Sequence, residues 1–299
     1  MSIPRNHHYV SQVLTRKFKD ANDIIYLYNK TSQEFSSTQS TKHLFSERDL
    51  NSTITEEGVV DHSSVEEILN RNFETGFNSC YETVVAALAN RNQIPNYEEV
   101  IRAIQYLVGM GIIGEMRNPH HMAKKQEIFL GTFRMLLEFA TPELKTIIQT
   151  HEQSLSGVKN KLPVDFKEIS DGVTELMGDI WFSIFIAPEN EYFLLPDCSS
   201  AVFRSQLEDD NIVDGETYYN LSRPISTVMM PINSKVLIMA RAAKICSRQS
   251  HGTGLLTSDL VYDQNQMLYK RAYERVACEN EEYLKRFMEK NDAITANVK

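Results

Sequence analysis

Two pairs of adjacent histidines are the residues of this sequence with the clearest potential for chemistry. His7 and His8 lie in the segment Asn-His-His-Tyr-Val near the N-terminus, and His120 and His121 follow Pro119. A neutral imidazole binds transition metals, and near its ordinary pKa of about 6.5 it exchanges protons with a substrate. Because adjacent side chains point in different directions in a strand or a helix, we expect one histidine of the first pair to face a site while the other orients the chain. The alternative is structural: an imidazole packed beside its neighbours and bonded to a main-chain carbonyl.

Arg117 stands just before the second histidine pair and suggests an anion-binding site. Its planar guanidinium can form two parallel hydrogen bonds to a phosphate or a carboxylate, and a helix that begins at Pro119 would add free backbone amides. A structural salt bridge from Arg117 to Glu74 or Glu47 explains the same residue equally well. The sequence leaves both interpretations open.

Carboxylates are the natural partners for such a site, because they bind hard divalent cations and act as general bases. We predict four catalytic residues: His8, His7, Glu74 and Arg117. For a divalent metal, we predict two further ligands, Glu47 and Asp197. No zinc-protease, serine-hydrolase, phosphate-loop or dinucleotide-binding motif accompanies them, which removes the commonest forms of those classes.

The composition limits the partners and the compartment. The chain has 299 residues, 42% of them hydrophobic, so it can bury a large core in one extended domain or two closely joined ones. A net charge of −9 argues against a broad surface for nucleic acid or anionic membranes, which Lys and Arg would have to supply. The four widely separated cysteines predict neither a zinc ribbon nor a disulfide framework. With no signal-peptide core and no apolar run near the roughly 18 residues that span a bilayer, we expect a soluble cytoplasmic protein with no membrane partner.

Hydrophobic patterning predicts strands at the two ends of the chain. Residues 23–29 are β-branched and aromatic before a polar stretch, which is typical of a strand entering a hairpin with a return strand near 33–37. Residues 180–186 and 192–195 flank Pro-Glu-Asn-Glu and predict a second hairpin. Further strands are expected at 228–231 and 236–240, and a flexible insertion at 205–222.

Helices are expected between and after these strands. Ser63 or Ser64, followed by Glu66 and Glu67, predicts a helix start, because a hydroxyl caps free amides and early acids favour the positive end of the helix dipole. That helix should run from about 64 to 91. Others are predicted at 97–115, 119–139, 142–156, 164–178 and 257–290, and the glycines at 109, 111 and 114 suit close packing.

The resulting fold class is α+β: a predominantly helical bundle with a small N-terminal β-hairpin and a C-terminal antiparallel sheet region. We predict a single domain over residues 1–299. Its sub-regions are a strand-containing segment at 1–60, the helical bundle at 64–178, and hairpins plus a long helix at 180–299.

Several short motifs together resemble a known family. They are Asn6-His7-His8-Tyr9-Val10, Tyr28-Asn29-Lys30, the region of Glu47, Arg117-Asn118-Pro119, and the late Asn265, Ala272 and Arg275-Val276. In these the chain resembles the domain of unknown function family 4238 over most of its length. The family motif reads His-Tyr-Val-Pro-Gln, and this chain has Ser11 in place of the proline.

The resemblance implies roles for particular residues and a setting for the protein. It assigns the motif histidine to His8 and further polar positions to Glu74, Arg117, Asp197, Asn265 and Arg275, of which we assign Asn265 and Arg275 to substrate binding. It implies a bacterial cytoplasmic protein, with an association with phage defence, mobile elements or a toxin system. The family carries no established reaction.

Two classes of function fit these observations. The first is a hydrolase that cleaves a phosphodiester in nucleic acid or a nucleotide, with His8 as base or metal ligand and a divalent metal as an optional cofactor. The second is a non-catalytic interaction or sensor protein, in which the His, Arg and acidic groups form a structural polar network. An activity lost in a folded His8 variant would separate the two.

Overall fold

The computed structural model describes residues 5–55, 58–89, 96–124, 127, 141–142, 145–146, 180–204, 225–242 and 251–298. Within these ranges it contains a five-stranded sheet, a four-stranded sheet and two small two-stranded sheets. The predicted helix at 164–178 and the predicted insertion at 205–222 lie outside the described residues. So do most of the predicted helices at 119–139 and 142–156, although residues 119–124 are helical.

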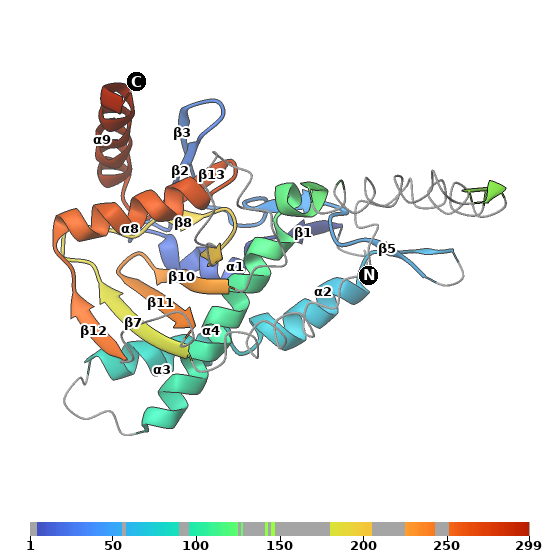
Figure 1. Cartoon of the computed structure of the whole chain (residues 1–299), viewed down its shortest axis with the longest axis horizontal. Coiled ribbons are helices and arrows are strands. Elements are labelled where there is room, and N and C mark those ends of the chain that lie inside the picture. The colour runs from blue at the N-terminus through green and yellow to red at the C-terminus, as the bar shows by residue number, and fades with distance from the viewer. Residues whose placement is uncertain are drawn as a thin grey trace.

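The five-stranded sheet is built entirely from the second half of the chain (Figure 1). Its strands, in spatial order, are β12 (Gly252–Leu255), β7 (Ile180–Ile186), β11 (Val236–Ala242), β10 (Ile225–Asn233) and β9 (Ala201–Arg204). Neighbouring strands are antiparallel except for β12 and β7, which are parallel. The predicted strands at 228–231 and 236–240 are confirmed as the β10–β11 hairpin.

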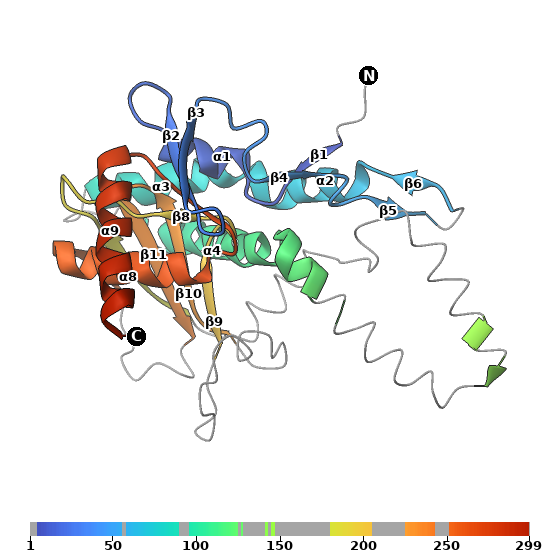
Figure 2. The ribbon, with the colours of Figure 1, turned by 90° about the horizontal axis from the view of Figure 1, so that it is seen from above.

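Helices cover both faces of this sheet (Figure 2). On one face α3 (Phe77–Ala89) and α4 (Tyr97–Arg117) share a buried cluster with alternate strand residues, among them Val228, Met230, Ile238 and Ala240. On the other face α8 (Ser258–Arg271) packs against the intervening residues, among them Met229, Leu237 and Met239. Because successive side chains of a strand point to opposite faces, burial on both sides requires the nearly continuous apolar runs seen in β10 and β11.

The four-stranded sheet joins the two ends of the chain. Its order is β3 (Glu34–Thr38), β2 (Ile25–Asn29), β13 (Arg275–Cys278) and β8 (Leu195–Pro196). The β2–β3 hairpin confirms the prediction for 23–29 and 33–37, and β2 pairs along its other edge with β13, with Tyr28 opposite Val276. The N-terminal hairpin is thus hydrogen-bonded to a strand from the C-terminal region.

The prediction of one long helix at 257–290 is wrong. The structure has α8, then β13, then α9 (Glu281–Val298). Lys30 ends α8 by donating from its ammonium to the carbonyl oxygens of Tyr269 and Ala272. The apolar residues after this cap complete a sheet instead of a helix, because the edge of β2 offers them hydrogen-bond partners far away in sequence.

The predicted hairpin between 180–186 and 192–195 is also wrong. β7 pairs with β11 and β12, and Leu195 enters the other sheet beside Ala277. The intervening turn is held by the β10–β11 turn instead, since Ala187 donates to the carbonyl of Lys235 and Phe193 to that of Ser234. The two apolar runs on either side of this turn therefore belong to different sheets.

The predicted helix at 64–91 is confirmed in part. It consists of α2 (Ser64–Leu69), a π-helical turn (Asn70–Glu74) and α3, with a break at residues 75–76. The predicted helix at 97–115 is confirmed as α4. The α+β class holds, but a predominantly helical bundle is not confirmed, because the two larger sheets make up a substantial part of the described structure.

Two glycines of α4 lie against the loop after β8. A Cβ on Gly111 would lie 2.8 Å from the Met230 sulfur, and one on Gly114 would overlap the Ser199 side chain and lie 3.1 Å from the Cys198 carbonyl oxygen. The predicted close packing is therefore found at these two positions, but the partner is a loop and a strand, not a second helix.

We expect Gly114→Ala to destabilise the protein by about 1–2 kcal/mol, although alanine favours a helix by about 1 kcal/mol over glycine. The physical reason is overlap with Ser199. Urea denaturation measures the change. The matched control is Gly252→Ala, where an added Cβ meets nothing within 4 Å. Equal stability of the two variants would contradict the packing argument.

Candidate functional site

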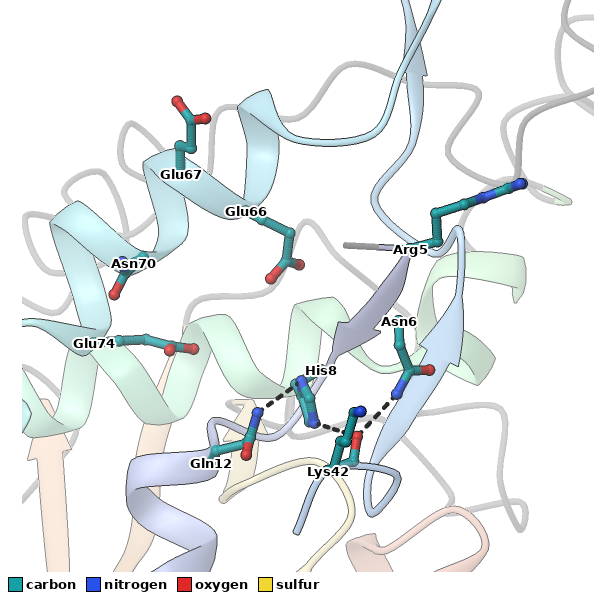
Figure 3. Close-up of a pocket in the computed structure, with 9 residues that line it drawn as sticks. All are labelled: Arg5, Asn6, His8, Gln12, Lys42, Glu66, Glu67, Asn70 and Glu74. Atoms are coloured by element: carbon teal, nitrogen blue, oxygen red, sulfur yellow. Dashed lines mark hydrogen bonds between the residues drawn. The ribbon is translucent and has the colours of Figure 1, made fainter. Parts of the chain in front are cut away.

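A polar pocket of about 660 Å³ lies between the N-terminal strand and the helical segment 64–74. Figure 3 shows its lining: Arg5, Asn6, His8, Gln12, Lys42, Glu66, Glu67, Asn70 and Glu74. The carboxylates come from α2 and the π-helical turn, whereas the cationic groups and His8 come from the opposite side (Figure 3). Glu66 and Glu74 project into the space between the two sides, and Glu67 points away from it (Figure 3). The pocket therefore has one acidic wall and one basic wall.

Strand pairing decides which histidine of the first pair enters the pocket. β1 (Asn6–His8) pairs antiparallel with β4 (Ser46–Arg48), with His7 opposite Glu47 and His8 opposite Ser46. Directly opposed residues share a face of the ribbon, and successive residues alternate. His8 therefore faces the pocket, and His7 and Glu47 lie on the other face.

Both ring nitrogens of His8 have protein neighbours that identify its tautomer. Nε2 lies 3.3 Å from the carbonyl oxygen of Thr41 and 3.1 Å from that of Lys42, and Nδ1 lies 3.5 Å from the amide nitrogen of Gln12. Since a carbonyl only accepts, Nε2 carries the proton, which leaves the Nδ1 lone pair on the side of Gln12. The neutral ring is thus held with its basic nitrogen facing a residue of the pocket wall.

Burial lowers the pKa of His8 below its ordinary value, and the charge of Arg117 acts in the same direction. The carbonyls of Thr41 and Lys42 and the charge of Glu66 oppose that lowering. The result is an imidazole that is neutral at pH 7 and able to accept a proton.

His7, which was predicted as catalytic, is fully buried and does not line the pocket. Its Nδ1 accepts a hydrogen bond from the backbone amide of Asn51 at 2.8 Å. Asn51 donates from its side chain to Glu66 at 2.5 Å, so His7 connects to the acidic wall through one residue. In this position it orients the chain, as expected for one member of the pair.

Arg117 lies at the C-terminal end of α4 and is buried among acceptors. Its Nη2 donates to the carbonyl oxygen of His8 and lies 3.7 Å from Glu66, and its Nη1 donates to Glu74 at 3.5 Å. The structure therefore brings His8, Glu74 and Arg117 together, as predicted. The guanidinium contacts protein groups, which agrees with the salt-bridge alternative. Because it is buried, it has no exposed face with which to bind the predicted phosphate.

Sequence reasoning missed Glu66, which it assigned only to a helix start. The available signal was spacing: Glu66, Asn70 and Glu74 recur every four residues, which places them on one face of a helix. The π-helical turn spans the second interval, with Thr75 donating its amide and its hydroxyl to the carbonyl of Asn70. Single π-turns within helices are frequent at functional sites.

The two predicted metal ligands do not line this pocket. Asp197 is buried beside β13, where its carboxylate accepts from the amides of Tyr273, Glu274 and Arg275 at 2.7–2.9 Å. Burial raises the pKa of Asp197, and these three hydrogen bonds act against the rise. Glu47 lies on the face of β4 opposite to His8. Among the described residues, no group of three or more His, Cys, Asp or Glu side chains is placed to hold a metal ion.

The two predicted substrate-binding residues do not line the pocket either. Asn265 is fully buried in α8, accepts from the Leu194 amide at 3.0 Å, and donates to the Tyr192 carbonyl and the Tyr283 hydroxyl at 2.7 Å. Arg275 is partly exposed on β13 and pairs with its neighbour Glu274 at 3.3 Å. Asn265 fastens α8 to the segment before β8 and to α9, and its polar groups are satisfied there.

A serine, a histidine and an aspartate also meet near Arg5, but without the geometry of a catalytic triad. The Ser52 hydroxyl lies 2.7 Å from His62 Nδ1, and Asp49 lies 3.4 Å from that same nitrogen. A triad needs the serine and the acid on different ring nitrogens. Arg5 binds Asp49 through two hydrogen bonds of 2.7 and 2.5 Å, so this cluster supports the rim of the pocket.

Comparison with known proteins gives a family match. A family model described as "Protein of unknown function (DUF4238)" matches residues 6–282. No curated protein and no solved structure matches the chain. In the part of the chain that the structure describes, no helix has the length and apolar character required to span a membrane.

We expect Arg117→Gln to destabilise the protein by about 2–4 kcal/mol, because it removes the cation shared by two carboxylates and one carbonyl in a buried setting. Chemical denaturation measures this loss. The control is Arg275→Gln, whose partly exposed ion pair should contribute less than about 1 kcal/mol. A double-mutant cycle with Glu74→Gln isolates the coupling, and a coupling near zero would contradict the assignment of Arg117 as the shared anchor.

Proposed function

Because the chain belongs to the DUF4238 family, whose description assigns no reaction, we propose from the pocket that it is a hydrolase that cleaves phosphodiesters of nucleotides or short nucleic acids. The observation that carries the proposal is the His8 imidazole, neutral and half-buried in a polar pocket that also contains Lys42. A base and a cation in one cavity are what a phosphodiester substrate requires.

His8 would supply the proton transfer. Its Nδ1 accepts the proton of an attacking water or hydroxyl as the new oxygen–phosphorus bond forms, and the bond from phosphorus to the leaving oxygen breaks. The leaving oxygen takes a proton from solvent, to which the pocket is open. The backbone carbonyls of Thr41 and Lys42 remain on Nε2–H and stabilise the imidazolium that results.

Lys42 would hold the phosphate. Its side chain is exposed and lines the pocket, and its own carbonyl contacts His8, so the cation is tied to the base through one hydrogen bond. Arg5 adds positive charge at the rim, but its guanidinium is already bidentate to Asp49. Positive charge at the site of phosphate attack stabilises the charge that develops in the transition state.

The acidic wall restricts the size of the substrate. Glu66 and Glu74 project into the cavity, and a carboxylate wall repels a continuous phosphate backbone. A cavity volume of about 660 Å³ is within the range of small-molecule sites. We therefore favour a nucleotide or a short single strand over a duplex as substrate.

A divalent metal is not part of the proposed step. Glu66 already accepts from Asn51 and lies beside the Arg117 cation, which makes it a poor ligand for a second cation. The proposal includes the setting implied by the family resemblance, a bacterial cytoplasmic protein in phage defence or a toxin system. Three cysteines, Cys80, Cys198 and Cys278, are free thiols, which supports a reducing compartment.

The alternative proposal is a non-catalytic sensor or interaction protein. The observation that favours it is the network of Arg117, Glu66 and Asn51, in which polar groups bind one another and fix β1 against the helices. Under this alternative His8→Ala lowers the melting temperature, and no preparation shows turnover.

The test measures hydrolysis of labelled RNA and DNA oligonucleotides and of bis(4-nitrophenyl) phosphate, each with magnesium, manganese or chelator. We expect His8→Ala to lower kcat/KM by roughly 100-fold or more, as is typical for loss of a general base. The control is His120→Ala, which removes an exposed imidazole outside the pocket lining. Circular dichroism and thermal melting confirm that the variants are folded. Full activity in a folded His8→Ala protein would overturn the assignment, and an inactive wild type would favour the sensor.

The pH profile gives a second prediction. Because the folded-state pKa of His8 is lowered, the base is available through pH 7, and kcat/KM should fall only as the pH drops below about 6.5. Lys42→Ala should raise KM and leave this acid limb in place. An acid limb with a midpoint above 7 would contradict His8 as the base.

A further inference from the structure

The side-chain amide of Gln12 has its orientation fixed by two donors. The Thr41 hydroxyl donates to Gln12 Oε1 at 3.1 Å, and Arg16 Nη2 donates to the same oxygen at 3.4 Å. Gln12 is the first residue of α1 (Gln12–Thr15), and Arg16 lies one turn later on the same face. With the oxygen committed to these donors, the NH2 group is directed to His8 Nδ1 (Figure 3).

The opposite side of the His8 ring specifies the same tautomer. Nε2 faces two carbonyl oxygens, of Thr41 and Lys42, and each requires a proton on that nitrogen. Thr41 therefore acts twice, through its carbonyl on Nε2 and through its hydroxyl on the amide that faces Nδ1. These contacts come from α1 and from the loop before β4.

We infer that Gln12 is a positioning residue that holds His8 in its neutral Nε2–H form and covers the nitrogen that takes up the proton. When Nδ1 is protonated, its N–H faces the N–H of Gln12, donor against donor. Rotation of the amide by 180° does not resolve this conflict, because it would turn the NH2 group toward the Arg16 guanidinium. Gln12 must therefore move aside as His8 accepts a proton.

Charged groups of both signs lie around His8. The charge of Glu66 favours the imidazolium, whereas that of Arg117 disfavours it. Glu74 and Lys42 also line the pocket, and Arg16 donates to the side-chain oxygen of Gln12. Of the described side chains, that of Gln12 lies within hydrogen-bond distance of Nδ1. Its donor group is therefore the local feature that opposes a proton on this nitrogen.

Gln12→Glu reverses that feature with little change in shape. A carboxylate accepts from Nδ1–H and still accepts from Thr41 and Arg16. We expect the pKa of His8, followed by the NMR titration of its ring Cε1 proton, to rise by about 1 or more. The resonance is assigned by its absence in His8→Ala. Gln12→Met is the comparison variant, because it keeps the length of the side chain and removes the donor without adding a negative charge, so we expect a smaller rise there.

The results of the Gln12→Glu titration can be told apart from a failure of the proposed hydrolase reaction. The inference rests on the proposed function for its catalytic use, but its test reads protonation and needs no turnover. A shifted pKa in a protein without hydrolase activity would keep the role of Gln12 and remove the proposed reaction. A His8 pKa that is the same in wild type and Gln12→Glu would overturn the inference, whatever the activity. Should Gln12→Glu not fold, the ring ¹⁵N shifts of the wild type decide: an Nδ1–H tautomer would overturn it and an Nε2–H tautomer would support it.

Discussion

The buried guanidinium of Arg117 is the interaction on which the arrangement of the pocket depends. It binds a backbone carbonyl of β1, a carboxylate of α2 and a carboxylate of the π-helical turn, from the end of a helix that packs across the five-stranded sheet. A buried cation is costly unless its surroundings supply acceptors, so each of these three segments must be in place at once. The pocket is thereby attached to the main core, although its walls are short elements that could not form a stable unit alone.

Buried polar side chains make similar connections around β13 and α8. Asp197 accepts three backbone amides around β13, Asn265 joins α8 to two other segments, and Lys30 caps α8. At a turn or a helix end, regular secondary structure leaves backbone groups without hydrogen-bond partners, and these side chains supply the partners. These three side chains are of types that are common in catalytic sites, but here they connect the two sheets and the helices that cover them.

The basic and the acidic side chains of the pocket lie on opposite sides. Its basic side is built from β1 and the loop before β4, its acidic side from one helical face, and the neutral imidazole of His8 lies with the basic side. Burial and Arg117 keep that imidazole uncharged, while two carbonyls and an amide determine which nitrogen carries its proton. In the proposed hydrolase, a base whose protonation is set by fixed dipoles would need little reorganisation when it reacts.

The sequence by itself determined the α+β class, the family resemblance, the β2–β3 hairpin and the helical segments that became α2, α3 and α4, and it offered Glu74 as one of two alternative partners of Arg117. Local signals suffice for these, since apolar periodicity and turn residues act over short distances. Tertiary structure decided the rest. The run at 275–278 is a strand because β2 offers it an edge, and Leu195 leaves β7 because it pairs with β13. Asp197 and Asn265 are connections because the backbone groups that they bind lie 71–78 residues away along the chain. No local pattern encodes such contacts, because they depend on which surfaces meet when the chain folds.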